Sequence, residues 1–96
     1  MKETKVLDHF DVAGVNFRRS DFRRAEVVNG DVLSLEPEPE NPHDPGAIKV
    51  LKSGIHIGYV PRTHTDRIRQ LESRGSIKCV VADGWVGGVY AEIFEA

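Results

Sequence analysis

Residues 36–50 read Glu-Pro-Glu-Pro-Glu-Asn-Pro-His-Asp-Pro-Gly-Ala-Ile-Lys-Val, an acidic loop rich in proline that passes directly into an apolar alternation. Proline fixes φ and pushes the preceding residue toward extended conformations, so this loop should be neither a helix nor a flexible linker. We expect it to hold Asn41, His43 and Asp44 close together, with Gly46 free to take a positive φ before the next strand. An ordinary Asx-type turn, whose side chains only satisfy the backbone, explains these residues equally well.

Short strands are predicted on both sides of this loop. Their ranges are Phe10–Phe17, Val32–Leu35, Ala47–Leu51, Ile55–Val60, Ile77–Ala82 and Val89–Phe94. Arg18–Val28 predicts a short helix or an ordered loop, and Thr63–Arg74 predicts an amphipathic helix that Thr63 caps and Gly75 ends. Six strands and so little helix predict a mainly β fold, a small six-stranded antiparallel β-barrel, closed or partly open, because barrels leave few strand edges exposed.

The bulk properties predict one globular domain. The chain has 96 residues, 40% hydrophobic and 29% charged, so we expect a single domain over residues 1–96 with the polar residues 1–5 frayed. No apolar run approaches the roughly 20 residues that cross a bilayer. The single cysteine, Cys79, lies in an apolar run and should be a small buried side chain in a reducing compartment. These features predict a cytoplasmic protein.

Catalysis and metal binding find little support in the sequence. None of the histidines has metal-ligand spacing to another histidine, and Cys79 is alone, so we predict no metal site and no cofactor. His43 and Asp44 suggest a base and its orienting group. Adjacent residues on an extended loop point to different sides, however, and no nucleophile motif accompanies them. We therefore predict that the protein is not an enzyme.

Aromatic residues with arginine close by favour nucleic-acid binding. The pairs are Phe17 with Arg18, Phe22 with Arg23, and Tyr59 with Arg62. An exposed ring stacks on a base and arginine contacts phosphate, a combination that suits single strands. The net charge of −2 argues against coating of duplex DNA. In the alternative interpretation, each ring fills the core and each arginine is solvated.

Three segments, in this order, resemble the HIRAN domain family. They are Val-Ala-Gly-Val-Asn-Phe-Arg at 12–18, Glu-Pro-Glu-Asn-Pro-His-Asp-Pro-Gly-Ala-Ile-Lys-Val at 38–50, and Ile-Gly-Tyr-Val-Pro-Arg at 57–62. The family is best known as the N-terminal module of helicase-like transcription factor and related fork-remodelling ATPases, where it is an OB-like β-barrel that captures single-stranded DNA at its 3′-hydroxyl end. The resemblance implies this fold and a non-catalytic DNA-binding function, associated with DNA repair or replication.

The resemblance also implies which residues contact DNA. They are Asn16, Phe17, Arg18, Asn41, His43, Asp44, Tyr59 and Arg62. Asp44 corresponds to the family's acidic residue that accepts a hydrogen bond from the 3′-hydroxyl. Phe17 and His43 correspond to rings that stack on the terminal bases, and Tyr59 and Arg62 to phosphate contacts.

Two substitutions within the motifs depart from the family pattern. His43 replaces the more usual tyrosine and offers less stacking area. Asn16 stands where the eukaryotic remodeller has a cationic residue, so phosphate affinity is reduced unless Arg18 substitutes. Asn41 lies in the loop that shapes the pocket.

A second functional class stays open at this point. In this alternative the same barrel is a protein–protein adaptor that binds through an exposed strand edge or its acidic loop. Because the domain fills the chain, we expect it to bind a single-stranded DNA end by itself or to recruit a DNA-processing ATPase or nuclease. Neither alternative involves a membrane.

Overall fold

The computed structural model describes residues 5–85 and 88–96, so the fraying expected for residues 1–5 falls almost entirely outside the described residues. Six antiparallel strands form one sheet in the order β1-β6-β5-β2-β3-β4. Their bounds are β1 Asp8–Asp11, β2 Val32–Pro37, β3 Ile48–Lys52, β4 Ile55–Tyr59, β5 Ile77–Trp85 and β6 Gly88–Glu95. The predicted mainly β, antiparallel fold is confirmed.

The sheet curls into a half-barrel, and one pair of residues joins its two edges. Ala13, just after β1, and Tyr59, at the end of β4, exchange two backbone hydrogen bonds of 2.8 Å. On the opposite side, β2 and β5 pair only at Val32↔Val80 and Leu33↔Cys79 before they separate. The barrel is therefore partly open, because one of its seams is short.

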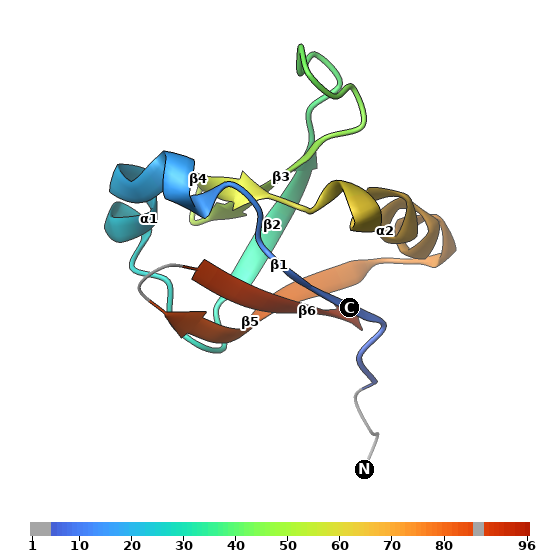
Figure 1. Ribbon diagram of the computed structural model, residues 1–96. Coiled ribbons are helices and arrows are strands. Elements are labelled where there is room, and N and C mark those ends of the chain that lie inside the picture. The colour runs from blue at the N-terminus through green and yellow to red at the C-terminus, as the bar shows by residue number, and fades with distance from the viewer. Residues whose placement is uncertain (1–4, 86–87) are drawn as a thin grey trace.

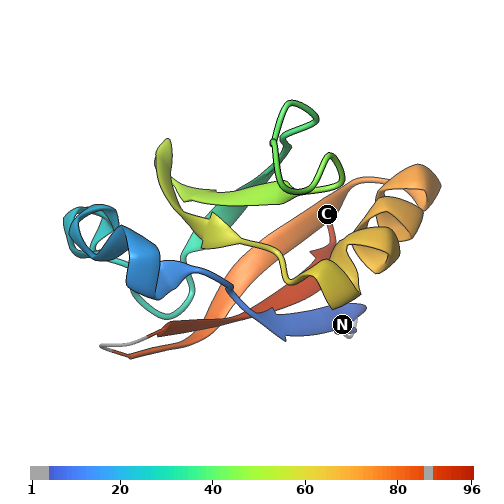
Figure 2. The same cartoon turned by 45° about the horizontal axis from the view of Figure 1, so that its top comes forward.

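Two helices cover opposite ends of the sheet (Figure 2). Helix α1 is Arg19–Ala25 and helix α2 is Arg62–Arg74. The apolar stripe of α2 is buried as expected, and Gly75 follows its last residue. The predicted cap was wrong: Pro61 precedes the helix, and Thr63 already lies in its first turn. Proline, whose φ is compatible with a helix start, takes the place before the first turn.

The expected strand Phe10–Phe17 is interrupted. Strand β1 ends at Asp11, Gly14 takes a left-handed conformation with φ 76°, and a 3₁₀ helix, η1, spans Val15–Arg18. The alternation of apolar residues continues through Gly14 in the sequence, but this glycine turns the backbone away from the sheet. The segment after it therefore places its side chains differently from a strand.

The remaining differences are smaller. Helix α1 confirms the helical alternative for part of Arg18–Val28. Strand β5 continues to Trp85, beyond the expected end at Ala82, and pairs with β6 on both sides of a bulge between Val81 and Asp83. The expected glycine-rich connection over 83–88 is thus largely strand, and its residues 86–87 lie outside the described residues. No helix in the described ranges is long and apolar enough to cross a membrane.

Candidate functional site

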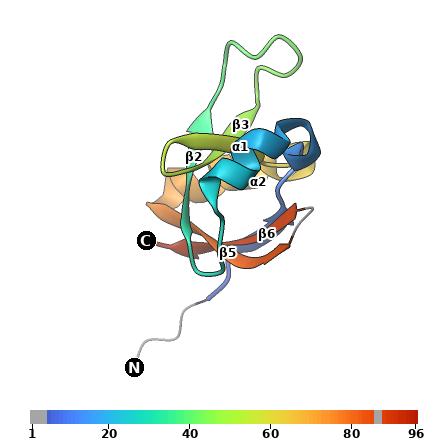
Figure 3. The same cartoon turned by 90° about the vertical axis from the view of Figure 1, so that its left-hand side faces the viewer.

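The loop between β2 and β3 projects from the sheet as the most prominent feature of the fold (Figures 1 and 3). Its conformation is set by Asn41, whose Oδ1 accepts the backbone N–H groups of His43 and Asp44, both at 2.9 Å. The Asp44 Oδ1 in turn accepts the Gly46 N–H at 2.9 Å. The expected Asx-type turn therefore exists, and it orients the side chains that the resemblance singled out.

Glu38 ties this loop to the barrel. Its Oε1 accepts hydrogen bonds from Asn41 Nδ2 at 2.6 Å and from Tyr59 Oη at 2.9 Å, while Lys49 Nζ lies 3.7 Å from Oε2. The Asn41 hydrogen bond, then that of Tyr59, holds the pKa of the Glu38 carboxyl below its ordinary value. Glu38 was missed as a site residue, because only the fold brings Tyr59 and Lys49 to it.

Helix α2 holds the other end of the loop. The Arg69 Nη2 donates a 2.6 Å hydrogen bond to the Gly46 carbonyl. A Cβ atom on Gly46 would lie 3.2 Å from Asp44 Oδ1 and 3.4 Å from Arg69 Nη1. Gly46 does not take the positive φ that was open to it; the structure uses this glycine for close approach, which a side chain would crowd.

Five of the eight candidate residues line one pocket of about 330 Å³. They are Asn41, His43, Asp44, Tyr59 and Arg62. The Arg62 Nε lies 3.4 Å from Asp44 Oδ2, and the Arg62 side chain is 81% exposed while that of Asp44 is 25% exposed. A largely covered carboxylate thus faces the pocket beside a guanidinium that extends into solvent.

Tyr59 forms one wall of this pocket. Its pKa is raised, first by burial and then by the hydrogen bond to Glu38, so the phenol is held as a neutral donor. The His56 ring packs edge-on against it, with 4.8 Å between ring centroids. Burial, followed by the positive charge of Arg18, lowers the pKa of His56 and favours its neutral form.

The other three candidate residues lie on η1. Phe17 is 94% exposed, and Arg18 lies near Tyr59, where it opposes the rise in the pKa of that phenol. Arg18 also approaches Asp21, with 3.5 Å between Nη1 and Oδ2. Asn16 does not join the pocket; it lines a separate groove beside helix α1. Phe17 is no core residue, so the interpretation in which its ring fills the core was wrong.

Among residues 5–85 and 88–96, no group of three or more histidine, cysteine or acidic side chains is placed to hold a metal ion. Cys79 is buried, and burial raises its pKa to about 12. Its thiol is therefore held in the protonated, unreactive form at neutral pH.

A curled antiparallel half-barrel with a rigid polar loop over one edge defines the class of small OB-like β-barrel domains. The chain belongs to the HIRAN domain family, whose family model matches residues 7–86. The resemblance seen in the three sequence segments is thereby confirmed. None of the curated proteins matches the chain significantly.

Two solved structures have the same fold. The HIRAN domain of human HLTF is 19% identical, with a TM-score of 0.71 over 95% of this chain and 77% of that chain. A protein from Lactobacillus plantarum is 17% identical, with a TM-score of 0.75 over 96% of this chain and 94% of that chain. At such identities the likeness concerns the fold alone.

Proposed function

We propose that residues 1–96 form a single non-catalytic nucleic-acid-binding domain that captures single-stranded or frayed DNA at a 3′-hydroxyl end. The observation that carries this proposal is the common pocket of His43, Asp44 and Arg62, which combines a ring, a hydrogen-bond acceptor and a cation. These are the groups needed to bind the base, the terminal hydroxyl and the phosphate of one nucleotide.

Asp44 is proposed to recognise the end. Its Oδ1 accepts a hydrogen bond from the Gly46 N–H. Its Oδ2 lies 3.4 Å from Arg62 Nε and can accept a further hydrogen bond. An ionised carboxylate only accepts hydrogen bonds, so it binds a terminal hydroxyl. A terminal phosphate would place a second negative charge beside it and be repelled.

The neighbouring residues are proposed to bind the rest of the terminal nucleotides. Arg62 contacts Asp44 through Nε, which leaves its terminal nitrogens available to a phosphate. Phe17 presents almost its whole ring to solvent, and His43 is exposed on the loop, so both suit stacking on bases. Arg18, near Tyr59, supplies the positive charge that Asn16 lacks.

The test is fluorescence anisotropy with a short labelled oligonucleotide that ends in either a 3′-hydroxyl or a 3′-phosphate. Wild-type protein should prefer the hydroxyl end, and Asp44→Asn should lose the preference. The matched control is Asp83→Asn, which makes the same charge change at an exposed position outside the pocket. Equal affinity of the wild type for both ends would refute end capture.

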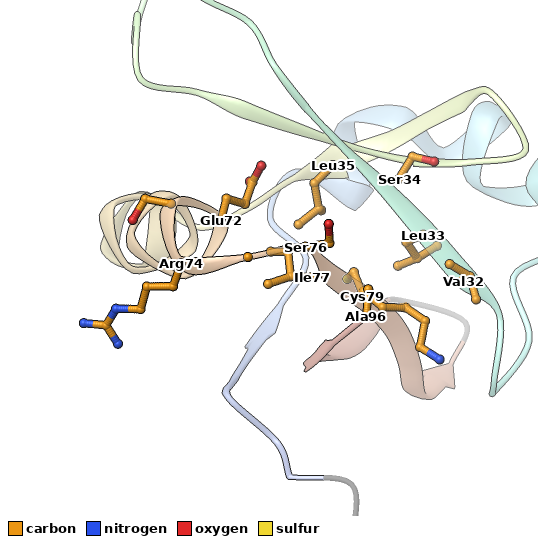
Figure 4. A pocket seen from close by; sticks show the side chains of 13 residues that line it. Val32, Leu33, Ser34, Leu35, Glu72, Arg74, Ser76, Ile77, Cys79 and Ala96 are labelled. Atoms are coloured by element: carbon orange, nitrogen blue, oxygen red, sulfur yellow. The ribbon is translucent and has the colours of Figure 1, made fainter.

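A different observation favours the adaptor alternative. Where β2 and β5 separate, a groove of about 800 Å³ opens between them and the end of α2, bordered by Leu35, Ile77 and Arg74 (Figure 4). Strands that part in this way offer backbone groups to which an extended segment of a DNA-processing ATPase or nuclease would add a strand. The Phe17→Ala, Arg62→Ala double variant separates the two functions. It should lose DNA binding if the pocket binds DNA, and retained binding of a protein partner would favour the adaptor.

A further inference from the structure

A second groove lies next to the end pocket, between α1 and the β5–β6 hairpin. Its volume is about 580 Å³, and its lining includes Asn16, Arg19, Phe22, Arg23 and Trp85. Only Asn16 of these belongs to the residues implied by the family resemblance. The groove combines aromatic rings with cations, the pairing that binds single-stranded nucleic acid.

Trp85 is held in place and half exposed. Its side chain is 51% exposed, and its ring lies so close to the backbone of Gly88 that a Cβ there would come within 2.6 Å of Trp85 Cζ2. Strand β5 is held near this end by the turn between α1 and β2, because the Gly84 N–H donates a 2.9 Å hydrogen bond to Asn29 Oδ1. The indole thus packs along the backbone at Gly88 and presents about half of its surface to solvent.

The two arginines of this groove form no ion pair in the described residues, although the carboxylate of Glu26 also lines the groove. Arg19 and Arg23 are one helical turn apart on α1, and both are exposed. Asp21 pairs with Arg18 at 3.5 Å and with Arg24 at 2.9 Å, and within the described ranges neither Arg19 nor Arg23 takes part in an ion pair. Both guanidinium groups are therefore available to an anionic ligand.

The short η1 segment connects this groove with the end pocket. Gly14, just before η1, lies against the Tyr59 ring, since a Cβ on it would be 4.0 Å from Tyr59 Cδ2. Asn16, two residues on, lines the groove, and the exposed ring of Phe17 follows directly. Residues 14–17 therefore lie between the pocket and the groove, and a strand bound in the pocket would cross them to reach the groove.

We propose that this groove binds the nucleotides upstream of the captured 3′ end, with Trp85 contacting a base and Arg19 and Arg23 contacting phosphates, while Phe22, which packs against the core, forms the floor. This proposal rests on the proposed function, because it extends the same strand. A single strand fits better than an acidic peptide, since its bases offer flat π faces to the indole between successive phosphates.

The experiment compares labelled 3′-hydroxyl oligonucleotides of about three and about ten nucleotides by anisotropy. Wild-type protein should bind the longer one more tightly. The double variant Arg19→Ala, Arg23→Ala should bind the longer oligonucleotide about tenfold more weakly than wild type. The slope of log K against log salt for this binding should become shallower by about 1.4. Binding of the short oligonucleotide and its preference for a 3′-hydroxyl should not change. Arg67→Ala, an exposed arginine on α2 outside both sites, is the matched control.

Trp85 gives a second, direct readout, because it is the single tryptophan of the chain. The longer oligonucleotide should quench its fluorescence and the shorter one should not. Trp85→Ala should remove the gain in affinity with length, and Trp85→Phe should restore part of it. Folding of each variant is checked by its urea midpoint.

The groove proposal is overturned if the arginine and tryptophan variants still bind the longer oligonucleotide more tightly than the shorter one to the same extent as wild type. It is also overturned if wild-type protein binds both lengths equally well. Binding of a poly-glutamate peptide that is lost in the Arg19→Ala, Arg23→Ala variant, while binding of the long oligonucleotide stays the same, would overturn the proposal in favour of a peptide ligand. Failure of end capture is seen separately, as equal binding of hydroxyl and phosphate ends by the short oligonucleotide.

Discussion

The hydroxyl of Tyr59, at the end of β4, donates a 2.9 Å hydrogen bond to Oε1 of Glu38, at the base of the projecting loop. The backbone of the same tyrosine forms the bridge to Ala13 that joins the two edges of the sheet. One residue therefore links the closure of the barrel with the position of the loop. We expect changes at either place to affect both.

Glu38→Gln tests the anchoring of the loop through pH. Because the folded pKa of Glu38 lies below its ordinary value of 4.5, the unfolded chain takes up the proton first as the pH falls. The resulting stability is present above pH 4.5 and is lost as the pH falls through the folded pKa. Urea denaturation of wild type between about pH 5 and about pH 3 should show this loss, and Glu38→Gln should show a smaller one. A part should remain in the variant, because the hydrogen bond from Lys52 also lowers the pKa of Asp31.

Glu40→Gln is the control for this prediction. Glu40 lies in the same loop and is exposed, and no hydrogen bond or ion pair joins it to the described residues. Its replacement should leave the pH profile unchanged. If both variants altered the profile equally, a general effect of loop charge would replace the role that we assign to Glu38.

Gly58→Ala should destabilise the closure of the barrel. A Cβ on Gly58 would lie 2.5 Å from the Ala13 oxygen and 2.6 Å from Val12 Cγ1, so backbone and core must both shift. We expect a loss of about 1–3 kcal/mol in the free energy of unfolding, measured in urea, with faster amide exchange at Ala13 and Tyr59. Gly75→Ala, where an added Cβ meets no atom within 4 Å, should be close to neutral.

Phe17→Ala should reduce binding without reducing stability. The ring is 94% exposed, so its loss should change the free energy of unfolding by less than about 0.5 kcal/mol. Affinity for a single-stranded 3′ end should fall about tenfold if the ring stacks on a base. Phe10→Ala, at a position 3% exposed, should instead cost about 3–5 kcal/mol of stability. Unchanged affinity in Phe17→Ala would remove that residue from the site.

Cys79 should be unreactive in the folded protein. With a pKa of about 12, about one thiol in ten thousand is ionised at pH 8, and the side chain is buried. An aromatic disulfide reagent should label it at the rate of unfolding in buffer and immediately in concentrated urea. Rapid labelling under native conditions would show that the gap between β2 and β5 opens easily.

Local patterns predicted some elements closely. Strands β3 and β4 and helix α2 begin and end within a residue of their expected bounds, because each has a regular apolar period and clear turn residues at its ends. The expected strand over Phe10–Phe17 failed because the conformation of Gly14 is not visible in the pattern of side chains. Continuity of an apolar alternation does not guarantee continuity of a strand.

Some residues of the candidate site are close together in the sequence, and others are brought together only by the fold. Asn41, His43 and Asp44 are neighbours in the sequence, so their proximity followed from the loop alone. Tyr59 and Arg62 join them in one pocket, as the resemblance implied. The partners of Glu38, Tyr59 and Lys49, could not be foreseen, because they come from other elements. The groove at Trp85 could not be foreseen either, since it exists only where α1 faces the β5–β6 hairpin.

The sequence by itself determined the stiff loop, the antiparallel strands and the family to which the chain belongs, since proline geometry, apolar period and motif spacing are local properties. Only the tertiary structure decided how the loop is anchored, that Phe17 is exposed and that Asn16 faces a second groove. These features depend on distant segments packing against one another, and the curl of the sheet, which no local pattern specifies, sets those distances.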